Sequence, residues 1–135
     1  MFLVFRLNLA LIAMDRLKVM IVEDEWIVSE EIKLLVEQCN GCVVGQSDNA
    51  EEALEILRAH QPQLAILDIR LRGEMDGIDL AEEIRRSLVC DVVFLSSLND
   101  KKTLERFRGI DPLMFIVKPF EVGNIREVMS MFAAH

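Results

Sequence analysis

The chain has 135 residues, of which 52% are hydrophobic and 28% charged, which suits one compact domain and is too short for two ordinary ones. Its 15 lysines and arginines are spread along the chain and are outnumbered by 23 acidic residues, so the net charge is −8. Because nucleic-acid binding needs a basic face that neutralises phosphates, this charge argues against direct contact with DNA or RNA.

The first segment, MFLVFRLNLALIAM, does not fit the rest of the chain. Arg6 and Asn8 interrupt it and no basic stretch precedes it, so it is a poor signal peptide, and it is shorter than the ~20 residues of a membrane span. Its alternating apolar residues would also suit an edge strand or an interfacial segment. Because MDRLKVMIVEDE, from Met14, looks like a complete beginning, we favour an upstream start codon as the origin of the segment. We expect an N-terminal extension of uncertain role over residues 1–16 and a single domain over residues 17–135. A protein that starts at Met14 should then fold like the full chain.

Beyond Met14, short apolar runs alternate five times with amphipathic stretches. The runs have strand length and cover residues 18–22, 42–46, 64–67, 92–95 and 114–117. The other stretches have helical periodicity and cover about residues 25–39, 49–60, 77–87, 100–108 and 121–133. Strands separated by helices of this length require right-handed parallel crossovers. We therefore expect an α/β fold, a doubly wound five-stranded parallel sheet in a three-layer sandwich.

Two of the three cysteines, Cys39 and Cys42, have the spacing of a redox motif. A reactive pair needs its attacking thiol at a helix N-terminus, where the helix dipole lowers the thiol pKa. Here the helical run precedes Cys39 and Asn40-Gly41 is typical of its C-terminal stop, so the dipole acts the wrong way. Zinc would need four ligands, and Cys90 and the two histidines, His60 and His135, are isolated. We expect reduced thiols of an intracellular protein.

The stretch LAILDIRLRG, residues 64–73, begins as a buried strand and then places Asp68 where the next core residue is expected. A strand that is apolar on both faces is typical of the centre of a parallel sheet, and such sheets bind ligands at the carboxyl ends of their strands. Asp68 is therefore a candidate for chemistry. An Asp beside Arg or Gly also commonly caps a turn, and this stretch alone favours neither interpretation.

Carboxylates also follow the first strand, where VEDE contains Glu23 and Asp24. If the fold brings these two beside Asp68, the three charges repel one another unless they share a cation. A hard ion such as Mg²⁺ suits three carboxylates, with water or a backbone carbonyl in its remaining positions. Taken alone, an acidic pair is more often a charge at a helix N-terminus.

The fourth and fifth strands end in FLSS and VKPF, which place Ser96, Ser97 and Lys118 at the same edge. Alone, a serine at a strand end usually makes a local hydrogen bond and a lysine is usually solvated. Their coincidence with the acids at four strand ends favours a site instead. A carboxylate nucleophile, a metal, a hydroxyl and an ammonium group are what phosphoryl transfer to Asp requires.

With VEDE, LDIRLRGEMDG, FLSS and VKPF in place, residues 17–133 resemble the receiver domain of two-component response regulators. The resemblance implies a flavodoxin-like fold with strand order 2-1-3-4-5, helices 1 and 5 on one face and helices 2, 3 and 4 on the other. It also implies that Asp68 is the phosphoacceptor. Mg²⁺ (or Mn²⁺) would be bound by Asp24 and Asp68, by Glu23 through water and by the backbone carbonyl of Arg70.

The resemblance further assigns Ser96 as the switch hydroxyl, Phe115 as the switch aromatic and Lys118 as the family's lysine. The bond from Lys118 to the following proline is often cis in such domains. The loop RLRGEMDG departs from the common pattern, because many members have a proline there and one residue fewer. By resemblance, Arg70 and Leu98 tune the lifetime of the phosphoryl group, in a direction that we leave open.

The function implied is that of a cytoplasmic regulator that takes a phosphoryl group from a histidine kinase or phosphotransfer protein. It catalyses only its own phosphorylation and dephosphorylation. Because the chain stops directly after the fifth predicted helix, we expect it to act alone, through a protein partner on the face formed by helix 4, strand 5 and helix 5. Whether it dimerises is left open.

Two alternatives use similar residues. A degenerate receiver would act as an interaction module without phosphorylation, but loss of an acid, of Asp68 or of Lys118 would indicate it, and all are present. A metal-dependent phosphatase also uses an Asp nucleophile, but it needs a second Asp two residues on as general acid, and that position is Arg70.

Overall fold

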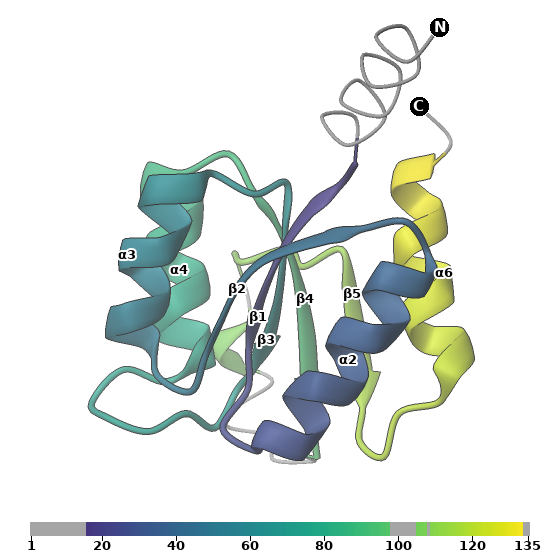
Figure 1. Ribbon diagram of the computed structural model, residues 1–135. Coiled ribbons are helices and arrows are strands. Elements are labelled where there is room, and N and C mark those ends of the chain that lie inside the picture. Colours follow the sequence, from purple (N-terminus) through teal and green to yellow (C-terminus); the bar gives the residue numbers. More distant parts are fainter. Residues whose placement is uncertain (1–15, 98–104, 108, 134–135) are drawn as a thin grey trace, which may run out of the picture.

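A five-stranded parallel sheet forms the centre of the computed structural model, which describes residues 16–97, 105–107 and 109–133 (Figure 1). The strands lie in the order β2-β1-β3-β4-β5, which confirms the predicted topology. They are β1 Lys18–Val22, β2 Cys42–Ser47, β3 Leu64–Asp68, β4 Asp91–Ser96 and β5 Met114–Val117. All four pairings are parallel, so every strand ends at the same edge of the sheet.

Two layers of helices cover the sheet, α3 and α4 on one face and α2 and α6 on the other (Figure 1). Their bounds are α2 Trp26–Gln38, α3 Ala50–His60, α4 Gly77–Ser87 and α6 Val122–Ala133. Each begins and ends within a residue or so of the predicted range. The helix expected at 100–108 falls mostly outside the described residues, as do the expected extension before Arg16 and the predicted role of Leu98.

Alternation along the strands explains the three layers. On β1, Met20 and Val22 pack toward α3 and α4, whereas Val19 and Ile21 pack toward α2 and α6, and all four are fully buried. Full burial of each such side chain contributes roughly 1.5–3 kcal/mol to folding. A central strand that is buried on both faces has to be apolar along its buried part, which in β1 is Val19–Val22.

Local hydrogen bonds define where the helices begin. The Asn49 side chain caps α3 by accepting a hydrogen bond from the backbone N–H of Glu52 (2.9 Å). In α4, Asp76 and Asp79 form a reciprocal capping box. The following Gly77 donates its backbone N–H to the carbonyl of Ile69 (2.7 Å). A Cβ on Gly77 would lie 2.0 Å from the carbonyl oxygen of Asp68, so only glycine allows α4 to begin this close to the end of β3.

The cysteines lie where the sequence placed them relative to the helix. Helix α2 ends at Cys39, and Asn40 has φ of 64°, a left-handed conformation typical of a helix stop. Cys39, Cys42 and Cys90 are free thiols. Burial raises the pKa of Cys90 to about 12, with a further contribution from Asp91, so this thiol is not a nucleophile at neutral pH.

In the described part of the chain, none of the helices combines the length and the apolar character that crossing a membrane requires.

Candidate functional site

The carboxyl ends of β1, β3, β4 and β5 bring the predicted site residues to one edge of the sheet, the lower edge in Figure 1. Glu23 and Asp24 directly follow β1, Asp68 ends β3 and Ser96 ends β4, while Lys118 directly follows β5. The side chain of Lys118 joins three of these strands, because it contacts acids from both β1 and β3.

Lys118 lies between two buried carboxylates. Its Nζ donates to Glu23 Oε1 (2.8 Å) and to Asp68 Oδ2 (3.1 Å). Burial lowers the pKa of Lys118, but these two hydrogen bonds and charges outweigh burial and hold the pKa above its ordinary value. Lys118 is therefore a permanent cation in the site at neutral pH. The peptide bond from Lys118 to Pro119 is cis, as the resemblance implied.

Asp68 is 5% exposed, and both of its carboxylate oxygens have partners. Oδ2 accepts from Lys118, and Oδ1 accepts from the backbone N–H of Arg70 (3.1 Å). Burial raises the pKa of Asp68 above its ordinary value, and contact with the Asp24 side chain adds to this effect, against the lowering effect of Lys118. The carboxylate therefore lies at the rim of the sheet, in reach of both a cation and a neighbouring acid.

Glu23 is 3% exposed, and only one of its two oxygens is paired. Oε1 accepts from Lys118 and from the backbone N–H of Glu25 (3.3 Å), whereas Oε2 has no hydrogen-bond partner. Burial raises the pKa of Glu23 to about 7, and the charge of Asp68 raises it further, against the lowering effect of Lys118. A buried carboxylate oxygen without a partner is costly, so this corner of the site is suited to a cation.

In the described part of the chain, Glu23, Asp24 and Glu25 form a cluster of acids whose ligand oxygens lie within 4.8 Å of one another. The sequence interpretation included Asp68 and the Arg70 carbonyl but missed Glu25. The signal was present, because VEDE contains three acids in a row at a strand-to-helix junction. Three carboxylates of this kind suit an oxygen-seeking divalent ion.

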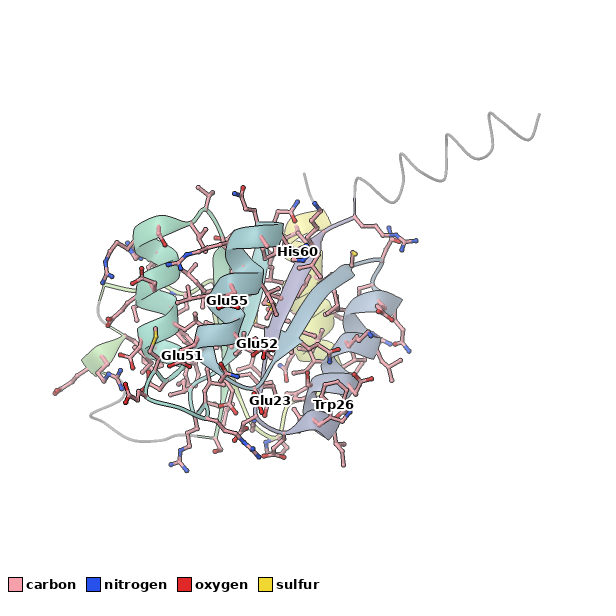
Figure 2. All side chains as sticks on the ribbon, turned by 60° about the vertical axis from the view of Figure 1, so that its left-hand side comes forward. Glu23, Trp26, Glu51, Glu52, Glu55 and His60 are labelled. Carbon is pink, nitrogen blue, oxygen red and sulfur yellow. The ribbon has the colours of Figure 1, made fainter. Side chains whose placement is uncertain are left out.

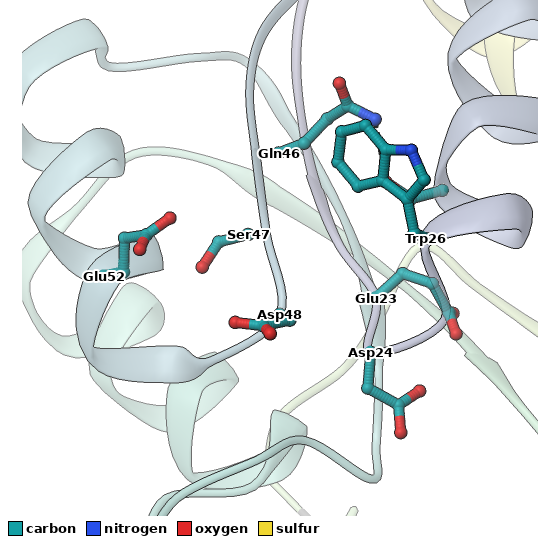
Figure 3. Close-up of a pocket in the computed structure, with 8 residues that line it drawn as sticks. Glu23, Asp24, Trp26, Gln46, Ser47, Asp48 and Glu52 are labelled. Atoms are coloured by element: carbon teal, nitrogen blue, oxygen red, sulfur yellow. Dashed lines mark hydrogen bonds between the residues drawn. The ribbon is translucent and has the colours of Figure 1, made fainter.

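Two hollows flank these acids. The larger, of about 640 Å³, opens over Asp68 and Lys118 and is also lined by Asp24, Glu25 and Ser97. The smaller, of about 210 Å³, lies on the other side of Asp24, between the start of α2 and the start of α3 (Figure 3). Its lining residues include Glu23, Asp24, Trp26, Gln46, Ser47, Asp48 and Glu52. Figure 2 places Glu23 and Trp26 at one end of the sheet, with His60 at the far end of α3.

The predicted switch residues lie at different depths. Ser96 is 1% exposed and pairs in register with Val117, next to Lys118. Phe115 lies on the α3/α4 side of β5, where its ring contacts that of Phe107 edge to face, with ring centroids 5.4 Å apart. A chain of aromatic contacts continues from Phe107 to Phe94 in β4 (4.9 Å).

Comparison with known proteins agrees with this geometry. The sequence model of one family, the response regulator receiver domain, matches residues 19–130. The chain is 29% identical to the transcriptional regulatory protein PdtaR of Mycobacterium tuberculosis, over 80% of this chain and 52% of that protein. It is 31% identical to the probable C4-dicarboxylate response regulator DctR of Bacillus subtilis, over 85% and 51%. The chain thus spans about half the length of these curated relatives.

Solved structures show the same architecture. The signal receiver domain of a modulated diguanylate cyclase from Desulfovibrio desulfuricans superposes with a TM-score of 0.82 and 27% identity, covering 89% of this chain and 95% of that one. The isolated REC domain of RcsB from Salmonella enterica, solved with the phosphomimetic BeF₃⁻, superposes with a TM-score of 0.80 at 21% identity, covering 89% and 90%. The second similarity concerns the fold alone.

Proposed function

The chain belongs to the response regulator receiver domains, and we propose that it accepts a phosphoryl group on Asp68 and signals by a conformational switch. The observation that carries the proposal is a buried carboxylate at the end of β3, held between the Lys118 ammonium (3.1 Å) and the Arg70 backbone N–H (3.1 Å). Receiver domains are generally signalling modules rather than enzymes, and the only reactions proposed here are those of Asp68 itself.

In the transfer step, an Asp68 oxygen attacks the phosphorus of a phosphohistidine. A new O–P bond forms while the N–P bond breaks, and the electron pair of that bond returns to the histidine nitrogen. Lys118 balances part of the negative charge of the incoming phosphoryl group from the rim of the large hollow. Hydrolysis of the acyl phosphate by water later regenerates the carboxylate.

A divalent cation, Mg²⁺ or Mn²⁺, fits the acids that surround Asp68. The unpaired Oε2 of Glu23 and the three clustered carboxylates supply oxygen donors, and one lysine cannot neutralise all of them. Asp24 and Asp68 would hold the ion directly, Glu23 through water, and the carbonyl of Arg70 would complete the protein's share. The ion supplies positive charge where the phosphoryl oxygens approach.

The proposed response starts at Ser96 and Phe115. When the Ser96 hydroxyl turns to the phosphoryl group, the space it leaves behind β4 lets Phe115 turn inward, away from Phe107. We propose that a downstream protein binds to the face formed by β5, α6 and the helix predicted over about residues 100–108, most of which lies outside the described residues. A histidine kinase or phosphotransfer protein would supply the phosphoryl group, in the cytoplasm as for response regulators generally.

The decisive test is incubation with acetyl phosphate and Mg²⁺, followed by intact mass measurement. The wild-type protein should gain one phosphoryl group, and should gain none in excess EDTA. Asp68→Asn should gain none, whereas Asp91→Asn, an exposed aspartate at the opposite edge of the sheet, should behave like wild type. Phosphorylation of Asp68→Asn would overturn the proposed acceptor. A wild-type protein that stays unmodified under all conditions would favour the phosphorylation-independent module.

Lys118→Ala tests the role of the Lys118 ammonium group. We expect it to keep the fold and to be phosphorylated more slowly, or to be phosphorylated without the conformational response. Amide hydrogen exchange with and without beryllofluoride measures that response. Wild-type behaviour in both assays would remove Lys118 from the site. Protection changes that leave residues 96–120 unaffected would refute the proposed output face.

A further inference from the structure

The acid that follows the predicted pair, Glu25, lies within the closest group of carboxylates in the described part of the chain. Ligand oxygens of Glu23, Asp24 and Glu25 all lie within 4.8 Å of one another. Oxygens on opposite sides of one divalent ion are about 4–5 Å apart, since each lies about 2.0–2.6 Å from the ion. The separation is therefore within the span of a single coordination shell.

An independent observation points to a ligand at this place. Glu23 is buried, yet its Oε2 has no hydrogen-bond partner. Its other oxygen accepts the backbone N–H of Glu25, so the conformation of the chain at Glu25 is tied to the position of the Glu23 carboxylate. The unsatisfied oxygen and the acid cluster are thus parts of one arrangement.

The side chain of Glu25 has no structural task that would explain it otherwise. Glu25 is the N-cap residue of α2, but its side chain makes no capping hydrogen bond. No described residue forms an ion pair with it, and it is exposed on the wall of the large hollow that Asp24, Asp68 and Lys118 also line. Its charge is therefore free to act on whatever enters that hollow.

We propose that Glu25 is a further carboxylate of the cation site, beside Glu23, Asp24 and Asp68, and sets the site's affinity for divalent ions. The inference rests on the proposed function, because it concerns the same ion. Glu25 adds a third negative charge to the cluster of Glu23, Asp24 and Glu25, and Lys118 forms an ion pair with only one of these acids, Glu23. A unit charge at 4–5 Å from a doubly charged ion in water-like surroundings changes binding by roughly fifteen- to thirtyfold.

The test compares Mn²⁺ binding to four proteins, with free Mn²⁺ measured by its electron paramagnetic resonance signal. Glu25→Gln should bind Mn²⁺ roughly fifteen- to thirtyfold more weakly than wild type. Glu31→Gln is the matched control, because Glu31 lies on the same helix and borders the same hollow but is outside the cluster. Its affinity should stay within twofold of wild type. Asp24→Asn should lose most of the binding.

The outcomes separate the two proposals. If Asp24→Asn loses binding but Glu25→Gln matches Glu31→Gln, Glu25 is not part of the site and the proposed function stands. If Asp24→Asn binds like wild type, the ion is held elsewhere and the proposed cation site fails first. Glu25 is exposed, so its replacement should leave the thermal melting curve in EDTA unchanged, which separates a lost ligand from a lost fold.

Discussion

The edge of the sheet at which the strands begin (the amino edge) differs from the edge at which they end (the carboxyl edge) in how its polar groups are paired. At the amino edge, where the strands begin, β1 starts with exposed Lys18 and β4 with exposed Asp91. Gln63 accepts a hydrogen bond from the backbone N–H of each: its side-chain oxygen bonds Lys18 (2.8 Å) and its backbone carbonyl bonds Asp91 (2.9 Å). At the carboxyl edge, β3 ends in buried Asp68 and β1 is followed by buried Glu23, whose Oε2 has no hydrogen-bond partner.

The hollows at the two edges differ in the same way. The hollow of about 220 Å³ at the amino edge is lined mainly by apolar side chains such as Leu57, Pro62 and Leu88. The large hollow at the carboxyl edge is lined by charged ones. Among the described residues, the one buried side-chain oxygen without a hydrogen-bond partner lies at the carboxyl edge, where we propose that a cation and a phosphoryl group enter. The carboxyl edge should therefore be the more sensitive to substitution, pH and ions.

The largest difference is expected from alanine at two glycines, one at each edge. A Cβ at Gly77 would lie 2.0 Å from the Asp68 carbonyl, which is backbone and cannot turn aside. At Gly41, before β2, the nearest atoms are Val36 Cγ1 and Met129 Cε, the ends of side chains. Gly77→Ala should cost about 3 kcal/mol of unfolding free energy and Gly41→Ala about 1. Urea denaturation of both proteins measures this, and equal losses would contradict the comparison.

The pH dependence of stability should differ between the edges. Glu23 has a folded-state pKa raised from 4.5 to about 7, so its stabilising contribution is complete below pH 4.5 and is lost as the pH rises to about 7. The pKa of Cys90 is also raised, from 9.0 to about 12, so its contribution to stability is likewise lost as the pH rises, but between pH 9 and about 12. We expect the metal-free protein to lose about 2 kcal/mol between pH 4.5 and 7.

Chemical denaturation in EDTA across this pH range measures the first loss. Glu23→Gln should flatten the profile, because glutamine does not titrate, and saturating Mg²⁺ should oppose the loss by binding the ionised form. A wild-type profile that is already flat in EDTA would show that Lys118 compensates the burial of Glu23.

Ion pairs should also contribute unequally. Arg106 binds both members of the α4 capping box, Asp76 (2.6 Å) and Asp79 (3.0 Å), and holds the pKa of Asp76 below its ordinary value against the effect of burial. The pair between Arg58 and Glu83 is longer, at 3.7 Å, and Arg58 is exposed. Arg106→Gln should cost about 1 kcal/mol and Arg58→Gln about 0–0.3, with both effects smaller in high salt. Denaturation midpoints at two salt concentrations provide the measurement.

The smallest effect is kinetic and leaves stability unchanged. Because the pKa of Cys90 is raised to about 12, its thiolate is scarce at pH 8, and iodoacetamide should modify it at least roughly a hundredfold more slowly than a free cysteine. Peptide mapping by mass spectrometry after timed alkylation follows Cys90 separately from Cys39 and Cys42. Rapid modification of Cys90 in the folded protein would show that the amino edge opens readily.

Much of this architecture could be predicted from the pattern of residues alone. The strands and helices begin and end close to their predicted limits because apolar periodicity reflects which face of each element is buried. The resemblance to a family predicted the strand order, and the structure confirms it. The edge at which the acids, Ser96 and Lys118 meet follows from parallel strands, since all of them end on the same side.

Contacts between distant residues needed the tertiary structure. That Lys118 bonds two acids, one of them 95 positions away, depends on how β1, β3 and β5 pack and twist, and no periodicity contains this information. The need for glycine at position 77 appears only when α4 is placed against the end of β3. The same holds for the unpaired oxygen of Glu23. The run of acids in VEDE was visible in the sequence, but the distances among the carboxylates on which the proposed role of Glu25 rests were not. Local sequence determines which face of each element is apolar, because that is a property of neighbouring residues. Which charges remain uncompensated is decided by packing, because it depends on every group that the fold brings near.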